Sequence, residues 1–274
     1  MTIAQAAPSP RPQEGHDTLV VTITPSKAQA YGQCPLYFAE VFSKQALHLA
    51  NQNIQRGKYL HSLIERYNVA IIDGTPMSID EVVARVPLPA AFRDGGDDER
   101  VAIDFARASL FGHKAWLEEQ DFAALCAAEQ YIRTTPRPVA GIEGVAVVFS
   151  GRIDLVALTR AHTLALIDFK AGNVLTSEAL QTAPASFVQA HLGAYTYASD
   201  ATEIIQVVPA TGQASRARLT DQDIEAGTLL CRAMVASVKE QSWSPRPGAY
   251  CSYCDYAAQC PAFIGGAGLT TVAF

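Results

Sequence analysis

The chain has 274 residues, of which 49% are hydrophobic, and a formal net charge of −6. That apolar content can form a core, which excludes a globally disordered chain, and no run approaches the ~18 apolar residues of a membrane span. The excess of acidic over basic residues argues against a strongly basic surface that covers nucleic acid. However, the excess of acid is local, because residues 72–105 carry eight acids and three bases, so nucleic acid can still bind elsewhere.

The N-terminal part of the chain predicts one strand followed by helices. A short strand is expected over 18–23, and a helix follows with Ser26 as its N-cap. Pro35 interrupts this helix because proline lacks the backbone donor, and a second helix is expected over 36–47. Apolar residues then recur at helical spacing over 54–70, which predicts a long amphipathic helix.

The middle of the chain changes from helical to β-rich patterns. Prolines and glycines break residues 72–96, and 97–119 predicts another helix, so we expect 72–119 to form an acidic helical insertion. Strands are expected over 127–134, 144–158, 164–170 and 204–208, and helices over 185–198 and 220–239. This order predicts an α/β fold with a central mixed sheet flanked by helices.

The domain organisation is expected to be simple. Residues 18–264 are predicted to form a single domain, between a disordered tail over 1–17 and a second tail over 265–274. The first sixteen residues lack the basic start and apolar run of a secretory signal. We therefore expect a cytoplasmic protein whose cysteines are reduced.

The most informative pattern is a predicted β-hairpin over 151–170. If its turn is centred on Ala161, alternation places four facing pairs on one side of the sheet. These pairs are Leu158 with Leu164, Val156 with Leu166, Asp154 with Asp168, and Arg152 with Lys170. Two carboxylates are thereby expected opposite each other, with Cβ atoms ~5 Å apart.

Two facing carboxylates repel each other, and a bound divalent cation would remove the conflict. Mg²⁺ and Mn²⁺ prefer oxygen ligands, which Asp154 and Asp168 supply. Lys170 on the same face could orient an attacking water or stabilise charge that develops on a phosphate. The alternative is a solvated charge cluster in which the two acids pair with Arg152 and Lys170.

Three cysteines lie close together near the C-terminus, at the spacing Cys251-x2-Cys254-x5-Cys260. Reduced cysteines at such spacing favour a metal site over disulfides, and Cys34 is the best candidate for a fourth ligand. The site could hold zinc or an iron–sulfur cluster, and it would link positions 217 residues apart. The alternative is three incidental cysteines, which is how we interpret Cys126 and Cys231.

Taken together, the hairpin and the cysteines resemble the PD-(D/E)xK nuclease superfamily over about Ser26 to Pro261. More narrowly, they resemble its RecB-type branch with an iron–sulfur cluster, which includes the CRISPR-adaptation and AddB-type nucleases. The resemblance implies that Asp154, Asp168 and Lys170 are catalytic. It also implies a 4Fe–4S cluster, whose four ligands would be Cys34, Cys251, Cys254 and Cys260.

The same resemblance assigns three further positions. Gly57-x3-His61 matches the helix that supplies a metal-binding histidine, although a histidine on an amphipathic helix is otherwise a surface or hydrogen-bonded core residue. The family places Gln-x3-Tyr on the helix after the hairpin, close to DNA. Here Tyr195 has His191 at that spacing, while Gln189 lies two residues earlier, and ordinary core packing is the alternative for Tyr195.

The implied fold is a restriction-endonuclease-like core with a helical insertion and a metal-stapled terminal subdomain over 245–264. The implied activity is phosphodiester hydrolysis by a DNA exonuclease acting on single-stranded ends, in DNA repair, recombination or CRISPR adaptation, with protein partners there and no membrane. Mg²⁺ or Mn²⁺ would be held by His61, Asp154, Asp168 and the carbonyl of Phe169. The alternatives are a catalytically silent DNA-binding module of the same fold, and a nuclease with zinc in place of the cluster.

Overall fold

The computed structural model describes residues 18–43, 52–93, 97–198 and 202–264. Both predicted tails lie outside these residues. The strands are β1 (Leu19–Ile23), β2 (Phe122–Arg133), β3 (Arg137–Val139), β4 (Ile142–Thr159), β5 (Leu164–Phe169), β6 (Thr202–Val208) and β7 (Gln213–Arg218). The helices are α1 (Pro25–Gln33), α2 (Pro35–Phe38), α3 (Gln52–Ile72), α4 (Ile79–Arg85), α5 (Asp97–Glu118), α6 (Ser177–Thr182), α7 (Pro184–Tyr197), α8 (Asp221–Glu240) and α9 (Pro261–Ile264).

The strands form one mixed sheet organised around the long strand β4. The strand order is β1-β4-β5-β6-β7, and β2 and β3 also pair with β4. The β1–β4 and β5–β6 pairs are parallel, while the β4–β5 hairpin and the β6–β7 pair are antiparallel. The parallel β5–β6 connection passes through α6 and α7, as a parallel crossover requires. The predicted α/β fold with a central mixed sheet is therefore confirmed.

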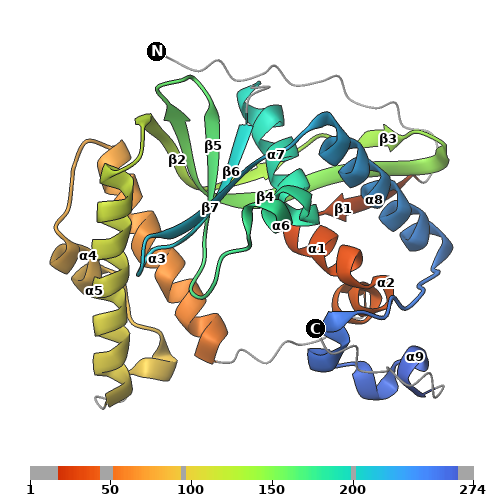
Figure 1. The fold of residues 1–274 in the computed structure, drawn as a ribbon, viewed down its shortest axis with the longest axis horizontal. Coiled ribbons are helices and arrows are strands. Elements are labelled where there is room, and N and C mark those ends of the chain that lie inside the picture. Colours follow the sequence, from red (N-terminus) through yellow and green to blue (C-terminus); the bar gives the residue numbers. More distant parts are fainter. Residues whose placement is uncertain (1–17, 44–51, 94–96, 199–201, 265–274) are drawn as a thin grey trace.

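Helices cover both faces of the sheet (Figure 1). On one face, α3, α4 and α5 pack on alternate residues of the inner strands, such as Leu155 and Ile167. On the other face, α1, α7 and α8 pack on the residues between them, such as Val156 and Leu166. This alternation explains why the inner strands are largely apolar, since a strand covered on both faces exposes neither side.

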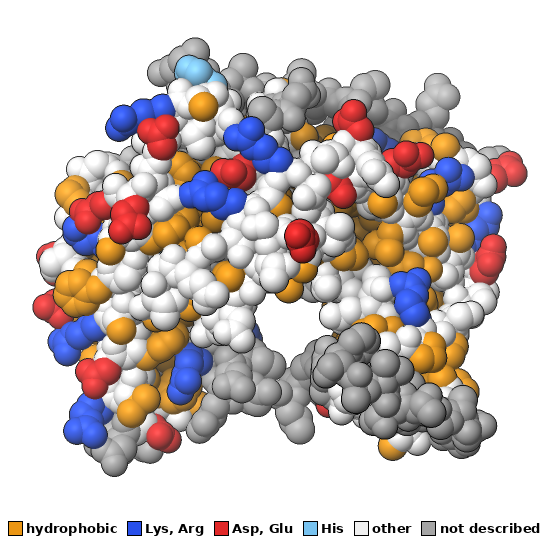
Figure 2. Space-filling view, in the orientation of Figure 1, with side chains coloured by type: hydrophobic (Ala, Val, Ile, Leu, Met, Phe, Trp, Pro, Cys, Tyr) orange, Lys and Arg blue, Asp and Glu red, His pale blue; other side chains and the backbone are white. Residues whose placement is uncertain are grey.

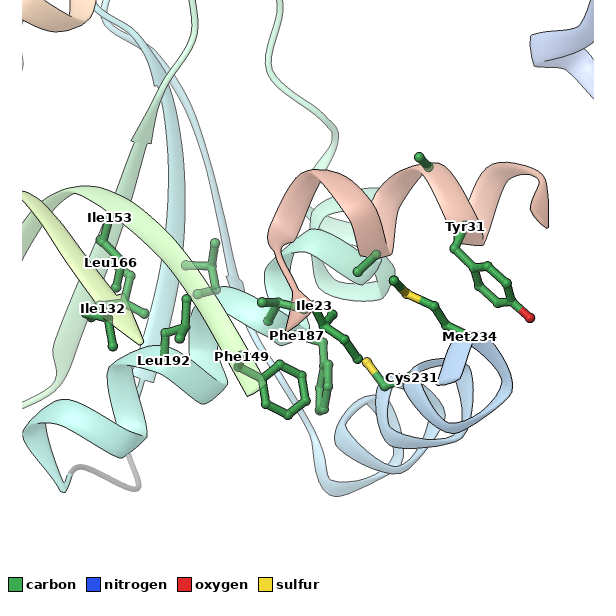
Figure 3. Packing of buried hydrophobic residues seen from close by; sticks show 14 of the residues in the cluster. Ile23, Tyr31, Ile132, Phe149, Ile153, Leu166, Phe187, Leu192, Cys231 and Met234 are labelled. Carbon is green, nitrogen blue, oxygen red and sulfur yellow. The ribbon is translucent and has the colours of Figure 1, made fainter. Parts of the chain in front are cut away.

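The core on the α1, α7 and α8 side is shown in Figure 3. Ile23 from β1 and Phe149 from β4 meet Phe187 of α7 and Met234 of α8 there, and all four side chains are buried. These contacts bring the start of the chain onto the middle of β4. As a result, α1 begins directly beside the strand that carries Asp154.

The structure corrects the predicted start of α1. Thr24, not Ser26, is the N-cap, and its side chain accepts a hydrogen bond from Lys27 N at 3.2 Å. Pro25 occupies the first turn, where its missing donor has no consequence. Pro35 does separate α1 from α2, as expected, but α2 passes at Ala39 into a π-helical turn that reaches Ser43. The rest of the predicted helix over 36–47 lies outside the described residues.

Four elements were not predicted, namely β3, α6, β7 and α9. Each is six residues or shorter, so its periodicity is too brief to stand out from the surrounding loop pattern. The expected helical segments at 72–119 are present as α4 and α5. None of the described helices combines the length and the hydropathy that crossing a membrane requires.

Candidate active site

The β4–β5 hairpin has the predicted register. Leu158 pairs with Leu164 and Val156 pairs with Leu166, as expected from a turn centred on Ala161. Beyond the paired residues, Phe169 N donates a hydrogen bond of 2.8 Å to Asp154 Oδ2. The carboxylate of Asp154 therefore lies beside the segment that contains Asp168, as the alternation predicted.

His61 joins Asp154 from the helix α3. Its Nδ1 atom lies 3.4 Å from Asp154 Oδ2 and 3.2 Å from Glu129 Oε1. One ligand atom from each of these three residues lies within 4.8 Å of the other two. Helix α3 packs on the sheet through buried residues such as Leu60 and Leu63, which fixes the position of His61.

Glu129 is the member of this site that the sequence analysis missed. It lies on β2 opposite Asp154, between the paired residues Ala128 and Gln130, with a left-handed backbone (φ +48). A left-handed conformation is uncommon outside glycine and is maintained here by the surrounding structure. The only signal in the sequence is a single acid within the uncharged segment that precedes Arg133. Glu129 reaches the site because β2 pairs with β4.

The electrostatics of the site reflect three acids around one imidazole. Burial raises the pKa of Asp154, and the charges of Asp168 and Glu129 raise it further, against the hydrogen bond from His61. Burial alone would lower the pKa of His61, but hydrogen bonds to Asp154 and Glu129 raise it to about 10. These shifts favour a positive charge at this position, which an imidazolium can supply in the metal-free chain.

The geometry of the site fits a divalent cation. Bonds of about 2.1 Å place neighbouring ligands about 3.0 to 3.4 Å apart in octahedral and tetrahedral coordination. The distances from His61 Nδ1 to Glu129 and Asp154, 3.2 and 3.4 Å, lie within this range. The carboxylate oxygens suit Mg²⁺ and Mn²⁺, and an imidazole nitrogen among them favours the transition metal over Mg²⁺.

Asp168 and Lys170 lie next to this triad and contact each other. Lys170 Nζ is 2.6 Å from Asp168 Oδ2. Gln206 Nε2 donates to the same oxygen at 3.0 Å. Arg152, which we expected to face Lys170, places its guanidinium 3.4 Å from Glu129 Oε2 instead. Part of the solvated charge cluster is therefore present, but the acids outnumber the bases and are largely buried.

A cavity of about 650 Å³ adjoins the site on the side of Asp168 and Lys170. The starts of α1 and α7 form its walls, together with Gly151 and Arg152 of β4. A side chain at position 151 would lie 3.0 Å from Pro25 and Leu192, so glycine is needed for α1 to approach β4 this closely. On the face shown in Figure 2, the surface is hollowed between the lobe of α3 to α5 and the lobe of α1 and α2.

Of the candidate DNA-contacting residues on α7, only Gln189 lines the cavity. His191 lies on another side of the helix, where its ring packs 4.3 Å from that of Phe149. Tyr195 accepts a hydrogen bond from Thr135 N at 3.4 Å, and the Arg137 guanidinium lies over its ring. The glutamine that departs from the expected spacing is therefore the one that approaches Asp168.

The comparisons with known proteins address the family directly. A family model described as the PD-(D/E)XK nuclease superfamily matches residues 22–261, most of the chain. The protein belongs to the PD-(D/E)XK nuclease superfamily. Among solved structures, one titled "Crystal structure of SSO0001" is 14% identical, with 82% of this chain and 93% of that chain covered and a TM-score of 0.33. The comparison with curated proteins found no match.

Membership of this nuclease superfamily assigns a general chemistry to the site. The chain has the fold of this superfamily of metal-dependent hydrolases. Within that fold, one histidine and two acids form a triad, namely His61, Glu129 and Asp154. Such nucleases act on the phosphodiester backbone of nucleic acid. The cavity of about 650 Å³ lies beside Asp168 and Lys170.

The second feature of this nuclease-family chain is a pocket of about 290 Å³ that all four predicted cysteine ligands line. Cys34 lies between α1 and α2, while Cys251, Cys254 and Cys260 lie on short turns before α9. Two backbone donors point at sulfur: Arg246 N lies 3.4 Å from Cys34 Sγ, and Gly248 N lies 3.3 Å from Cys251 Sγ.

The other two cysteines are outside this pocket. Cys231 is a buried core residue of α8, and Cys126 is half-buried on β2. Among the residues that the structure describes, no three cysteine sulfurs lie within 4.8 Å of one another. A single zinc ion with bonds of about 2.3 Å would need neighbouring sulfurs about 3.8 Å apart.

Proposed function

We propose that this protein is a metal-dependent DNA nuclease, an exonuclease that acts on single-stranded ends. The observation that carries the proposal is the convergence of His61, Glu129 and Asp154 at ligand distances beside Asp168 and Lys170. A non-catalytic module of this fold would have no need for three acids in a poorly solvated site. We further propose that the ends it trims arise in repair, recombination or CRISPR adaptation.

In this proposal His61, Asp154, Asp168 and the carbonyl of Phe169 hold Mg²⁺ or Mn²⁺, with Glu129 as a further ligand. The ion would lower the pKa of a water and neutralise charge on the phosphate. The Lys170 ammonium, held on Asp168, stabilises the negative charge that builds on the phosphoryl oxygens during attack. Arg152 is well placed to bind a neighbouring phosphate, because its side chain is exposed at the cavity wall.

We propose that a single strand enters the cavity. The cavity lies between the starts of α1 and α7, and Gln189 and Asn173 offer amides at its wall. Amides can contact bases whose edges are exposed, as they are in single-stranded DNA. Tyr195 and His191 lie further along α7, where we propose that they contact the strand beyond the cavity.

We also propose that the four cysteines of the pocket hold a structural 4Fe–4S cluster. The sulfurs lie around one pocket but are spaced more widely than one zinc ion requires, which favours a larger centre. The N–H groups of Arg246 and Gly248 that point at sulfur would stabilise thiolate charge. Such a centre would close the domain by joining its two ends.

The test is the degradation of labelled linear single-stranded DNA by the full-length protein with Mn²⁺ or with EDTA. We expect cleavage with Mn²⁺ only, and a loss on the order of 10³-fold in Lys170→Ala. Lys114→Ala is a matched control, since Lys114 also pairs with an acid, Glu118, but far from the cavity. Circular single-stranded DNA should resist an exonuclease.

Equal, low activity in all conditions would instead support the DNA-binding module. Cleavage of circles at the rate of linear DNA would contradict the exonuclease assignment while keeping the nuclease. Iron and sulfide analysis of protein purified without oxygen tests the cluster separately. Zinc in a colourless protein would favour the alternative metal.

A further inference from the structure

Gln206 is a buried polar residue in an apolar strand. It lies on β6, where its neighbours Ile204, Ile205, Val207 and Val208 are buried and apolar, and it is itself only 6% exposed. Burying an amide without hydrogen-bond partners costs roughly 1 to 3 kcal/mol, so its partners explain its presence. In the parallel β5–β6 ladder, Gln206 lies directly beside Asp168.

Both ends of the Gln206 amide are hydrogen-bonded. Leu175 N donates to Oε1 at 3.1 Å, and Nε2 donates to Asp168 Oδ2 at 3.0 Å. A backbone N–H can only donate, so it must face the amide oxygen. The amide NH₂ is therefore directed at the carboxylate, and the orientation of Gln206 follows from its partners.

This contact determines which oxygen of Asp168 remains for an ion. In the described part of the chain, Lys170 Nζ and Gln206 Nε2 both contact Oδ2. Oδ1 is then the oxygen that these two donors leave for an ion. Two donors on one oxygen also restrict rotation of the carboxylate, which lowers the entropy lost on binding an ion.

The other end of the amide reaches the loop between β5 and α6. Leu175 lies in this loop just before Thr176, the N-cap of α6, and it lines the cavity together with Asn173. The same cavity is lined by Gln206 and Asp168. One side chain therefore joins a candidate metal ligand to the wall of the cavity.

We propose that Gln206 is a positioning residue that orients Asp168 for metal binding and ties it to the cavity loop. The inference rests on the proposed function, because it takes Asp168 as a ligand. Loss of the amide would let the carboxylate rotate and the loop move. Groups that orient metal ligands typically change metal affinity 10- to 100-fold when they are removed.

The test is Mn²⁺ binding to the full-length protein without DNA, measured by calorimetry or by the Mn²⁺ EPR signal. Gln206→Met keeps the shape of the side chain but removes both hydrogen bonds, and we expect about 10-fold weaker binding. Gln181→Met is a matched control, since Gln181 makes the same kind of bond to Asp223 on the distant helix α8. It should leave the affinity unchanged.

A folded Gln206→Met protein with the wild-type Mn²⁺ affinity would overturn the inference. If that variant does not fold, Leu175→Pro removes the backbone donor to Oε1 together with the leucine side chain and keeps Gln206 itself, and we expect several-fold weaker binding. The wild-type affinity in this second variant would then overturn the inference. Asp168→Asn should weaken binding more than either. If wild-type protein itself binds no Mn²⁺, the proposed function fails, and not merely the role of Gln206.

Discussion

The triad of one histidine and two acids and the cysteine pocket are built in opposite ways. The triad of His61, Glu129 and Asp154 rests on a long strand, its neighbour and a long helix, all packed on the buried core. The cysteine pocket is formed by short turns before α9, where Cys251 and Cys254 are only partly buried. The core holds the first site in place, whereas we propose that the second depends on a metal centre bound by its sulfurs.

This difference indicates separate roles for the two regions. Ligands fixed by a rigid sheet can be tuned for catalysis, because the scaffold holds them in unfavourable proximity. Ligands on turns gain their order from the metal, so that binding energy becomes folding energy. Damage to the triad should therefore abolish activity and spare stability, and damage to the pocket should do the reverse.

The largest expected effect comes from Asp154→Asn. We expect DNA cleavage to fall on the order of 10³-fold, because the variant loses a ligand oxygen of the ion. The melting temperature of the metal-free protein should stay within a few degrees, since the charge of Asp154 is disfavoured by burial and by Asp168. Asp121→Asn, which alters an exposed acid paired with Arg160, is the control. A large drop in the melting temperature of Asp154→Asn would contradict the expected difference between the triad and the cysteine pocket.

The next-largest effect is expected from a change in the cysteine pocket. Cys254→Ser should lose bound metal and lower the melting temperature by roughly 10 °C or more, because binding at such sites contributes to folding. Cys126→Ser changes a half-buried cysteine outside the pocket and should leave both quantities unchanged. Calorimetric melting and metal analysis of the two variants check this. A Cys254→Ser protein as stable as the wild type would show that the pocket does not hold the domain together.

A smaller effect concerns the packing of His113 behind β5. Burial lowers the pKa of His113 to about 3, and its ring packs edge-on against Phe169. The unfolded chain takes up this proton below about pH 6.5 and the folded chain does not, so stability falls as the pH drops towards 3. At pH 5 we expect a loss of about 2 kcal/mol relative to pH 7. Urea unfolding should show this loss in the wild type and not in His113→Gln.

A second pH-dependent effect tests the electrostatic account of the triad. Hydrogen bonds to Asp154 and Glu129 outweigh burial and raise the pKa of His61 to about 10, above its value in the unfolded chain. This contribution to stability is complete below about pH 6.5 and is lost as the pH rises through 10. In EDTA, the melting temperature should fall more between pH 7 and 10 for wild type than for His61→Gln. Equal slopes would contradict a protonated His61 in the metal-free site.

Local patterns in the sequence determined the hairpin and its register. Alternation and a single turn sufficed to place Leu158 opposite Leu164 and Val156 opposite Leu166, because a tight turn closes the pair along the chain. The same alternation brought Asp168 and Lys170 to one side of β5. The helix with His61 also followed from periodicity, since it extends over many turns.

Tertiary structure alone decided the neighbours that come from distant strands. Glu129 meets Asp154 because β2 pairs with β4, and register shifts along β2 could not be read from its own sequence. Gln206 reaches Asp168 only because the crossover through α7 places β6 beside β5. Periodicity reports which face a residue occupies, while the identity of its neighbour depends on how separate segments pack, and no local pattern contains that information.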